Sequence, residues 1–179
     1  IGIPGVVACL YQLHEHNGSL PLQNVMAPAI AFAEEGFRIF SMDARRQQIT
    51  KAVFELFEGI KTHFLNTAGR AVKAYELVVQ KTLANTLKEI AAKGKAGFYE
   101  GEVAQKMVED IQANGGILTL EDLKNYKALH AEVLEGSFQG ADIYALNLPS
   151  YGAITIQILQ ILDQLPQPET EEAWAKLFD

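Results

Sequence analysis

The sequence has 179 residues, of which 49% are hydrophobic and 21% are charged, and its formal net charge is −7. This length is enough for a single domain with a sizeable core over residues 1–179, and the acidic balance argues against nucleic-acid binding, which needs clustered Lys and Arg. The lone Cys9 excludes an internal disulfide and a thiolate metal cluster, and no apolar run is long enough to predict a membrane span.

Helical periodicity dominates the first half of the chain. Pro4 suits a first helical turn, because its missing N–H would have no partner there, and Pro28 is expected to bend or restart the helix that contains it. Ser41 is expected to cap the third helix. The helices expected on these grounds cover residues 4–16, 22–36, 42–58 and 82–93. The apolar residues expected to face inward on the last two are Ile49, Val53, Leu56, Phe57, Leu83, Leu87 and Ile90.

Residues 59–80 carry the weakest pattern in the chain. Gly59, Asn66 and Gly69 indicate turns. Residues 76–79 are expected to form a short extended piece.

Residues 95–126 have the most regular start and stop signals. A helix is expected from Gly101, and Asn114-Gly115-Gly116 is expected to end it, because Gly and Asn reach the left-handed conformation at little cost. The apolar face of this helix is expected to carry Val103, Met107, Val108 and Ile111. Thr119 is expected to cap the next helix, with Asp122 completing a capping box.

The only convincing strand signal lies at residues 131–147, where strand-forming residues flank Gln139-Gly140 in the manner of a β-hairpin. Residues 151–165 are apolar almost all round and predict a helix that is buried on most sides. A short helix is expected over residues 171–178. Because two strands alone are marginal in water, these features indicate a part of a larger assembly. The fold class expected is α+β, mostly α-helical, with one β-hairpin.

Several side chains suggest chemistry, but their spacing argues against it. His14 and His16 point about 200° apart on a helix, so they cannot chelate one metal ion together. Glu34 and Glu35 face about 100° apart before a glycine stop, which favours solvated residues over a paired acid–base site. Cys9 lies in an apolar helix and is expected to be a small core residue. We therefore expect neither a metal site nor a cofactor.

Several sequence blocks follow one another along the chain. They are Gly2-Ile3-Pro4-Gly5, the G-x-L-P and P-A-I-x-x-A-E-x-G pattern of residues 18–36, then G-F-Y-x-G-E, Q-A-N-G-G and L-T-x-E-D-L-x-x-Y within residues 95–126. In this order they resemble the large subunit of γ-glutamyltranspeptidases over roughly residues 2–36, 83–127 and 131–160. Residues 59–80 lack the prolines of that family's loop, and Lys81-Thr82 stands where Pro-Asp is common. The chain therefore resembles a divergent member.

The resemblance implies an N-terminal nucleophile hydrolase of the αββα fold. In that family a precursor cuts itself, and the new N-terminal threonine of the small subunit attacks a γ-glutamyl carbonyl. The acyl group then passes to water or to an amino acid. The enzyme would act on γ-glutamyl compounds such as glutathione, with no cofactor, and bacterial members are usually periplasmic or secreted. A related acylase and a non-catalytic helical interaction module are the alternatives.

The resemblance also implies that the catalytic parts lie outside this sequence. No threonine here stands in the family's T-T-H context, and the arginine that binds the substrate carboxylate would precede Gly2. Because the sequence starts with Ile1 on a helix-opening motif, we expect a processed or excised part of a longer protein. Its expected partners are the remainder of the large subunit and the small subunit that carries the nucleophile. The isolated fragment is expected to self-associate.

Ser150, Tyr151 and Gly152 are the candidate substrate-binding residues. They lie in the stretch Leu148–Ala153, which resembles the family's P-P-S-S-G-G and leads into the helix at 151–165. A helix N-terminus offers N–H donors to an anion, so this turn is a candidate wall of a substrate pocket. The simpler interpretation is capping by Ser150 and close packing that needs Gly152. Tyr151 stands where the family usually has serine, so its phenol could close or reshape a pocket.

Overall fold

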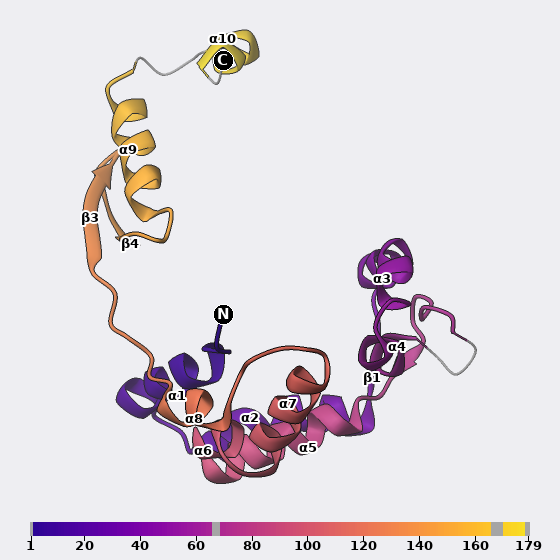
Figure 1. Ribbon diagram of the computed structural model, residues 1–179. Helices are drawn as coiled ribbons and strands as arrows, with labels where there is room; N and C mark the ends of the chain where they lie inside the picture. The colour runs from indigo at the N-terminus through magenta and orange to yellow at the C-terminus, as the bar shows by residue number, and fades with distance from the viewer. Residues whose placement is uncertain (1, 66–68, 166–169, 178–179) are drawn as a thin grey trace. The chain divides into compact units, whose positions relative to one another are not determined.

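The computed structural model describes residues 2–65, 69–165 and 170–177, and the chain forms two compact units, Ile1–Ala128 and Leu129–Asp179 (Figure 1). Unit 1 contains α1 (Val6–Asn17), α2 (Leu22–Glu35), β1 (Phe37–Arg38), α3 (Ser41–Phe54), α4 (Glu58–Phe64), β2 (Leu77–Val78), α5 (Lys81–Lys93), α6 (Ala96–Tyr99), α7 (Gly101–Ala113) and α8 (Leu120–Asn125). Unit 2 contains β3 (Val133–Phe138), β4 (Ala141–Leu146), α9 (Gly152–Asp163) and α10 (Glu171–Leu177). The prediction of a single domain over residues 1–179 stays a prediction.

The N-terminal helices follow the sequence prediction with three differences. α1 begins at Val6, so Pro4 precedes the helix instead of lying in its first turn. α2 runs through Pro28 as one helix, so of the two predicted effects the restart does not occur and the bend stays a prediction; the proline costs one backbone hydrogen bond. α3 begins at Ser41 and ends at Phe54, with Phe40 at the N-cap position and no side-chain capping bond, so the predicted Ser41 cap is also wrong.

The predicted inward face of α3 is exposed. Ala44 is buried and Phe54 stacks on Phe64 of α4, with ring centroids 5.3 Å apart, and these residues define the inner side of the helix. The four residues predicted to face inward are all more than half exposed: Ile49, Val53, Leu56 and Phe57. The prediction is wrong because α3 carries apolar residues on two opposite sides, and periodicity alone does not say which side unit 1 covers.

Of the other predictions of burial, one is confirmed and two are wrong. On α5, Ile90 is buried as predicted, whereas Leu83 is 44% exposed. Cys9, predicted to be a core residue, is exposed. Burial of an apolar residue therefore depends on which neighbouring elements unit 1 supplies.

A small antiparallel sheet joins two distant segments of unit 1. Phe37 of β1 pairs with Val78 of β2, and Arg38 pairs with Leu77. The predicted extended piece at residues 76–79 is confirmed by β2, but the sequence prediction missed β1 and the short helix α4. Two-residue strands contain too few positions to show an alternating pattern.

The core of unit 1 is built around Tyr99, which is 1% exposed. Its hydroxyl donates to the backbone oxygen of Pro4 at 2.6 Å and accepts from the backbone N–H of Ala8 at 3.1 Å. Its ring stacks on the Tyr126 ring, with 5.8 Å between the two ring centroids. Lys95 Nζ lies over the Tyr99 ring, 5.5 Å from its centroid. Burial raises the pKa of Tyr99, which keeps the hydroxyl protonated as a donor. One side chain thus fixes the start of α1 against residues 95–126.

Two glycines of the sequence blocks allow close approaches in this core. A Cβ atom at Gly97 would lie 2.2 Å from the backbone oxygen of Glu89 in α5, and one at Gly5 would lie 2.2 Å from the Tyr126 hydroxyl. Any larger residue would push these elements apart. The glycines are therefore needed for packing in unit 1.

The predicted signals in residues 95–126 are confirmed. α7 ends at Ala113, and Gly115 takes a φ of +82° just beyond it. Thr119 Oγ1 accepts from the N–H of Asp122 at 3.1 Å, and Asp122 Oδ2 accepts from the N–H of Thr119 at 2.9 Å. The Thr119 hydroxyl and N–H hold the pKa of Asp122 below its ordinary value. This reciprocal pair is the capping box that the sequence predicts.

Unit 2 is a β-hairpin with α9 lying along it (Figure 1). β3 and β4 pair from Val133↔Leu146 to Phe138↔Ala141, and Gln139 and Gly140 between them both have positive φ. The predicted hairpin is therefore confirmed. A Cβ atom at Gly136 would lie 2.6 Å from Ile156 Cγ2, so this glycine lets α9 approach β3.

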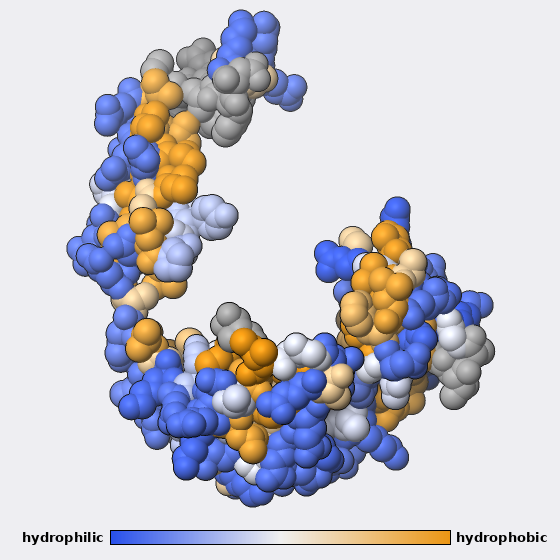
Figure 2. Space-filling model, viewed as in Figure 1, coloured by the Kyte–Doolittle hydropathy of each residue, from blue (hydrophilic) through white to orange (hydrophobic). Residues whose placement is uncertain are grey.

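The outer side of α9 is more exposed than predicted. Ile156 is buried against the hairpin, whereas the opposite side remains about half exposed at Ile154, Ile158 and Ile161. Figure 2 shows apolar side chains gathered along α9 and over the α3 region of unit 1. Because a two-stranded sheet can cover only one side of a helix, the predicted burial on most sides is not met within unit 2.

Candidate functional site

The turn between β4 and α9 is held by Asn147. Its backbone N–H donates to the Glu132 backbone oxygen at 3.0 Å, and its side-chain Nδ2 donates to Glu132 Oε2 at 2.6 Å. Its Oδ1 accepts from the N–H of Leu148 at 2.7 Å, and its backbone oxygen accepts from the N–H of Ser150 at 3.0 Å. The Leu148–Pro149 peptide bond is cis. The turn is therefore anchored on the strand side by one amide side chain.

Gly152 fixes the helix side of the same turn. It is buried, and a Cβ atom there would lie 2.1 Å from the Leu146 backbone oxygen and 2.8 Å from the Ala145 Cβ. The predicted close packing at Gly152 is confirmed. The predicted capping by Ser150 is wrong, because Tyr151 is the N-cap residue of α9 and no side chain caps the helix.

Tyr151 presents its phenol to solvent and is 78% exposed. Its backbone oxygen accepts from the N–H of Thr155 at 2.9 Å and from the Thr155 hydroxyl at 3.0 Å, so the main chain at Tyr151 is fixed while the ring is not covered. The first N–H groups of a helix have no acceptor within that helix. The turn can therefore offer N–H donors beside an aromatic ring to a carboxylate or an oxyanion, but residues 147–152 include no carboxylate or imidazole for proton transfer.

A groove in unit 1 lies between α5 and α7 and has a volume of about 620 Å³. Phe98, Val103 and Met107 supply apolar lining, and Glu102 and Lys106 form an ion pair of 2.6 Å at its edge. The hydrogen bond between the two side chains, helped by their opposite charges, lowers the pKa of Glu102 and raises the pKa of Lys106. The groove has no serine, cysteine or histidine among its lining residues, so it offers no nucleophile of those types paired with a base.

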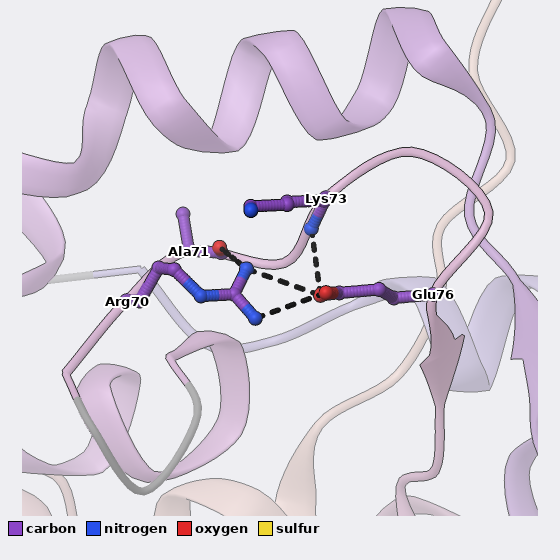
Figure 3. A network of polar contacts seen from close by, with 4 residues as sticks. All are labelled: Arg70, Ala71, Lys73 and Glu76. Carbon is purple, nitrogen blue, oxygen red and sulfur yellow. Dashed lines mark hydrogen bonds and ion pairs between the residues drawn. The ribbon is translucent and has the colours of Figure 1, made fainter.

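Arg70 of unit 1 forms an internal ion pair with a carboxylate. Arg70 donates from Nη2 to Glu76 Oε1 at 2.9 Å and from Nη1 to Glu76 Oε2 at 3.1 Å, and Nη1 also donates to the Ala71 backbone oxygen (Figure 3). The N–H of Lys73 donates to the same carboxylate at 2.8 Å. These contacts close the loop that precedes β2. The hydrogen bond from Arg70 is the main reason why the pKa of Glu76 is below its ordinary value.

Replacing Glu76 with Gln should lower the stability of unit 1 at neutral pH and leave it unchanged at low pH. A carboxylate whose pKa is lowered by folding contributes stability above its ordinary pKa of 4.5, and that contribution is lost as the pH falls through the folded-state value. Urea unfolding midpoints from about pH 7 down to about pH 3 should therefore converge for the two proteins. The same substitution at the exposed Glu15 is the control, and parallel pH curves for Glu76→Gln and wild type would contradict the assignment.

The histidines that the sequence analysis weighed as metal ligands engage separate partners. His14 Nε2 lies 2.9 Å from the Leu20 backbone oxygen, and His16 Nδ1 lies 2.8 Å from the Gln12 backbone oxygen. Within the described ranges, no group of three or more His, Cys, Asp or Glu residues is placed to hold a metal ion. No helix in the same ranges is both long and apolar enough to cross a membrane.

Comparison with known proteins places this arrangement in a family. A family model for gamma-glutamyltranspeptidase matches residues 1–178. The chain is 36% identical to glutathione hydrolase proenzyme 2 of Schizosaccharomyces pombe over 166 residues, which cover 93% of this chain and 27% of that protein. The chain thus spans less than a third of the length of this relative and of other curated relatives that it matches.

Solved structures agree with the sequence relatives. Helicobacter pylori γ-glutamyltranspeptidase matches 99% of this chain and 52% of its own, with a TM-score of 0.93 at 30% identity. Cephalosporin acylase from Bacillus halodurans matches 98% of this chain and 34% of its own, with a TM-score of 0.87 at 25% identity. The predicted fold is confirmed as a mostly helical α+β segment of an N-terminal nucleophile hydrolase. The chain belongs to the γ-glutamyltranspeptidase family.

Proposed function

We propose that residues 1–179 form a scaffold segment of the large subunit of an enzyme that transfers γ-glutamyl groups from compounds such as glutathione to water or to an amino acid. The close match to the Helicobacter pylori γ-glutamyltranspeptidase over nearly the whole chain carries this proposal. Relatives named as glutathione hydrolase proenzymes support both the substrate class and maturation from a precursor. The nucleophile in this proposal is an N-terminal threonine outside residues 1–179.

The reaction would proceed by acyl transfer. The threonine hydroxyl attacks the γ-glutamyl carbonyl and its own α-amine takes the proton. The α-ammonium then gives this proton to the leaving nitrogen, the C–N bond breaks, and the acyl-enzyme ester remains. Water or an amino acid then attacks the ester carbonyl and releases the threonine. The developing oxyanion needs donors that are already in place, and the substrate carboxylate needs a cation outside this chain. The segment alone would therefore be inactive.

Within this reaction, Ser150, Tyr151 and Gly152 would form part of the wall of the substrate pocket. The anchoring of this turn by Asn147 and the buried Gly152 support the assignment, because a binding surface needs a fixed backbone. The exposed Tyr151 ring would narrow the pocket relative to the serine of the family pattern. Tyr151 would then affect which γ-glutamyl compounds bind.

The expected partners are the remainder of the large subunit and the small subunit with the nucleophile. The outer side of α9 supports such a partner, because Ile154, Ile158 and Ile161 are about half exposed there and apolar side chains gathered in one place are normally covered by a partner. The same exposure supports self-association of the isolated segment. A related acylase of another acyl specificity is the second candidate, and the similarity to the Bacillus halodurans acylase favours keeping it in the test.

Expression of the longer protein that contains this chain tests the proposal. We expect two polypeptides after maturation and hydrolysis of a γ-glutamyl anilide. Replacing Tyr151 with Ser should change KM for γ-glutamyl substrates without preventing maturation. The same replacement at Tyr144, which is exposed on β4, is the control and should change neither KM nor maturation. Cleavage of other acyl amides but not γ-glutamyl amides would favour the acylase. A persistent single polypeptide without amidase activity would favour a non-catalytic interaction module and contradict the proposal.

A further inference from the structure

Asn147 uses each of its four hydrogen-bonding groups within unit 2. Its backbone N–H and its Nδ2 both donate to Glu132, at 3.0 Å to the backbone oxygen and at 2.6 Å to Oε2. Its Oδ1 accepts from the Leu148 N–H at 2.7 Å, and its backbone oxygen accepts from the Ser150 N–H at 3.0 Å. One residue therefore ties the segment that precedes β3 to the turn that carries the candidate site.

The two side-chain bonds of Asn147 need a donor and an acceptor on one short side chain. An amide supplies both, whereas a carboxylate supplies acceptors only. The bond to Glu132 also has a charged acceptor, and such bonds are stronger than those between neutral groups. With Asp at position 147, one oxygen could still accept from the Leu148 N–H, but the other would lie against the Glu132 carboxylate. Two carboxylates at this distance repel each other, so the amide is specific to this arrangement.

The exposed side chains of the turn depend on the backbone for their position. Ser150 and Tyr151 are both exposed, so packing within unit 2 does not fix either side chain. The backbone that carries them is held at both ends. Gly152 packs against the Leu146 backbone oxygen on the helix side, and Asn147 holds the strand side. The direction in which the Tyr151 ring is presented is therefore set by these two anchors.

We propose that Asn147, through its side-chain bond to Glu132, is a positioning residue for the pocket wall formed by Ser150, Tyr151 and Gly152. The inference rests on the proposed function of this turn. Asn147 acts through the wall and not by contact with the substrate. It holds the wall in one arrangement before the substrate arrives, which lowers the cost of ordering the turn on binding. Breaking the bond should therefore raise KM and leave kcat nearly unchanged, because the reacting groups lie elsewhere.

Kinetics of the mature longer protein with a γ-glutamyl anilide test this role. Asn147→Asp keeps the shape of the side chain and places two carboxylates together. It should raise KM by about 10-fold, the size expected for losing a hydrogen bond to a charged group, and keep kcat within about twofold. Asn24→Asp is the matched control, because it adds the same charge at an exposed position of α2, and it should keep KM within about twofold of wild type.

Exchanging the two groups shows whether the contact itself sets KM. When Glu132→Gln is combined with Asn147→Asp, the new amide can donate to the new carboxylate, so the bond returns with donor and acceptor exchanged. KM of the double variant should return to within about threefold of wild type. Glu132→Gln alone keeps an acceptor for Nδ2 but removes its charge, so it should raise KM less than Asn147→Asp does. Thermal unfolding of each variant, followed by circular dichroism, measures stability separately from binding.

The positioning role and the proposed function fail in different ways. If wild type cleaves the anilide and Asn147→Asp has the KM of the Asn24→Asp control, the positioning role is wrong and the proposed function stands, even where unfolding shows a less stable unit 2. A raised KM or a failure of maturation that persists in the double variant would overturn the role, and so would a fall in kcat at unchanged KM. A wild-type protein without γ-glutamyl activity would overturn both.

Discussion

Replacing Tyr99 with Phe should lower the free energy of unfolding of unit 1 by about 1–3 kcal/mol. The ring and its stacking on Tyr126 would remain, but the buried Ala8 N–H and the part-buried Pro4 oxygen would lose the hydroxyl that they share as a partner. Leaving buried polar groups without a hydrogen bond costs more than the bond itself contributes. Urea unfolding followed by far-ultraviolet circular dichroism measures the change.

The matched control is Tyr75→Phe, which removes the same hydroxyl from a side chain that is 62% exposed. Its effect should stay within about 0.5 kcal/mol. Replacing Tyr99 with Ala should cost about 3–5 kcal/mol, because the ring contacts are lost as well. Equal effects of Tyr99→Phe and Tyr75→Phe would mean that the hydroxyl does not hold α1 in place.

Replacing Gly152 with Ala should lower the stability of unit 2 by about 1–3 kcal/mol. The added methyl group would lie 2.1 Å from the Leu146 backbone oxygen, so the start of α9 and the end of β4 must move apart. Thermal unfolding by circular dichroism should show a lower transition temperature. Gly59→Ala adds the same methyl group where no atom lies within 4 Å and should not lower it. A normal transition in Gly152→Ala would show that the turn is not tightly packed.

Local signals in the sequence predict much of this fold. The Thr119–Asp122 capping box, the glycine stop after Ala113 and the hairpin turn at Gln139-Gly140 depend on residues a few positions apart, and the structure has each of them. Contacts between distant residues are not accessible in this way. The bonds from Tyr99 join residues 91 and 95 positions apart, and no spacing rule connects them.

Burial is the property that the sequence predicts least well. Ile49 and Val53 have the helical period of a core face, yet they are exposed because α3 packs through Ala44 and Phe54 on its other side. A pattern shows that a face is apolar, but the element that covers it is set by the tertiary structure. The same holds for α9 and for Leu83 of α5.

The candidate site is predictable only in its position. The resemblance of Leu148–Ala153 to a family block locates the turn, and the packing role of Gly152 follows from the usual reason for a glycine at a close approach. The Ser150 cap fails because the chain enters α9 one residue later, at Tyr151. The anchoring role of Asn147 was missed, although an Asn before a turn is a common signal for such bonds.

The most direct test of the central claim is to label the mature longer protein with an electrophilic γ-glutamyl analogue and to locate the adduct by mass spectrometry. If residues 1–179 are a scaffold for a nucleophile elsewhere in the protein, the analogue should add one equivalent to an N-terminal threonine of a second polypeptide and none to residues 1–179. An adduct within residues 1–179, or a mature protein that contains no such threonine and takes no label, would contradict the account.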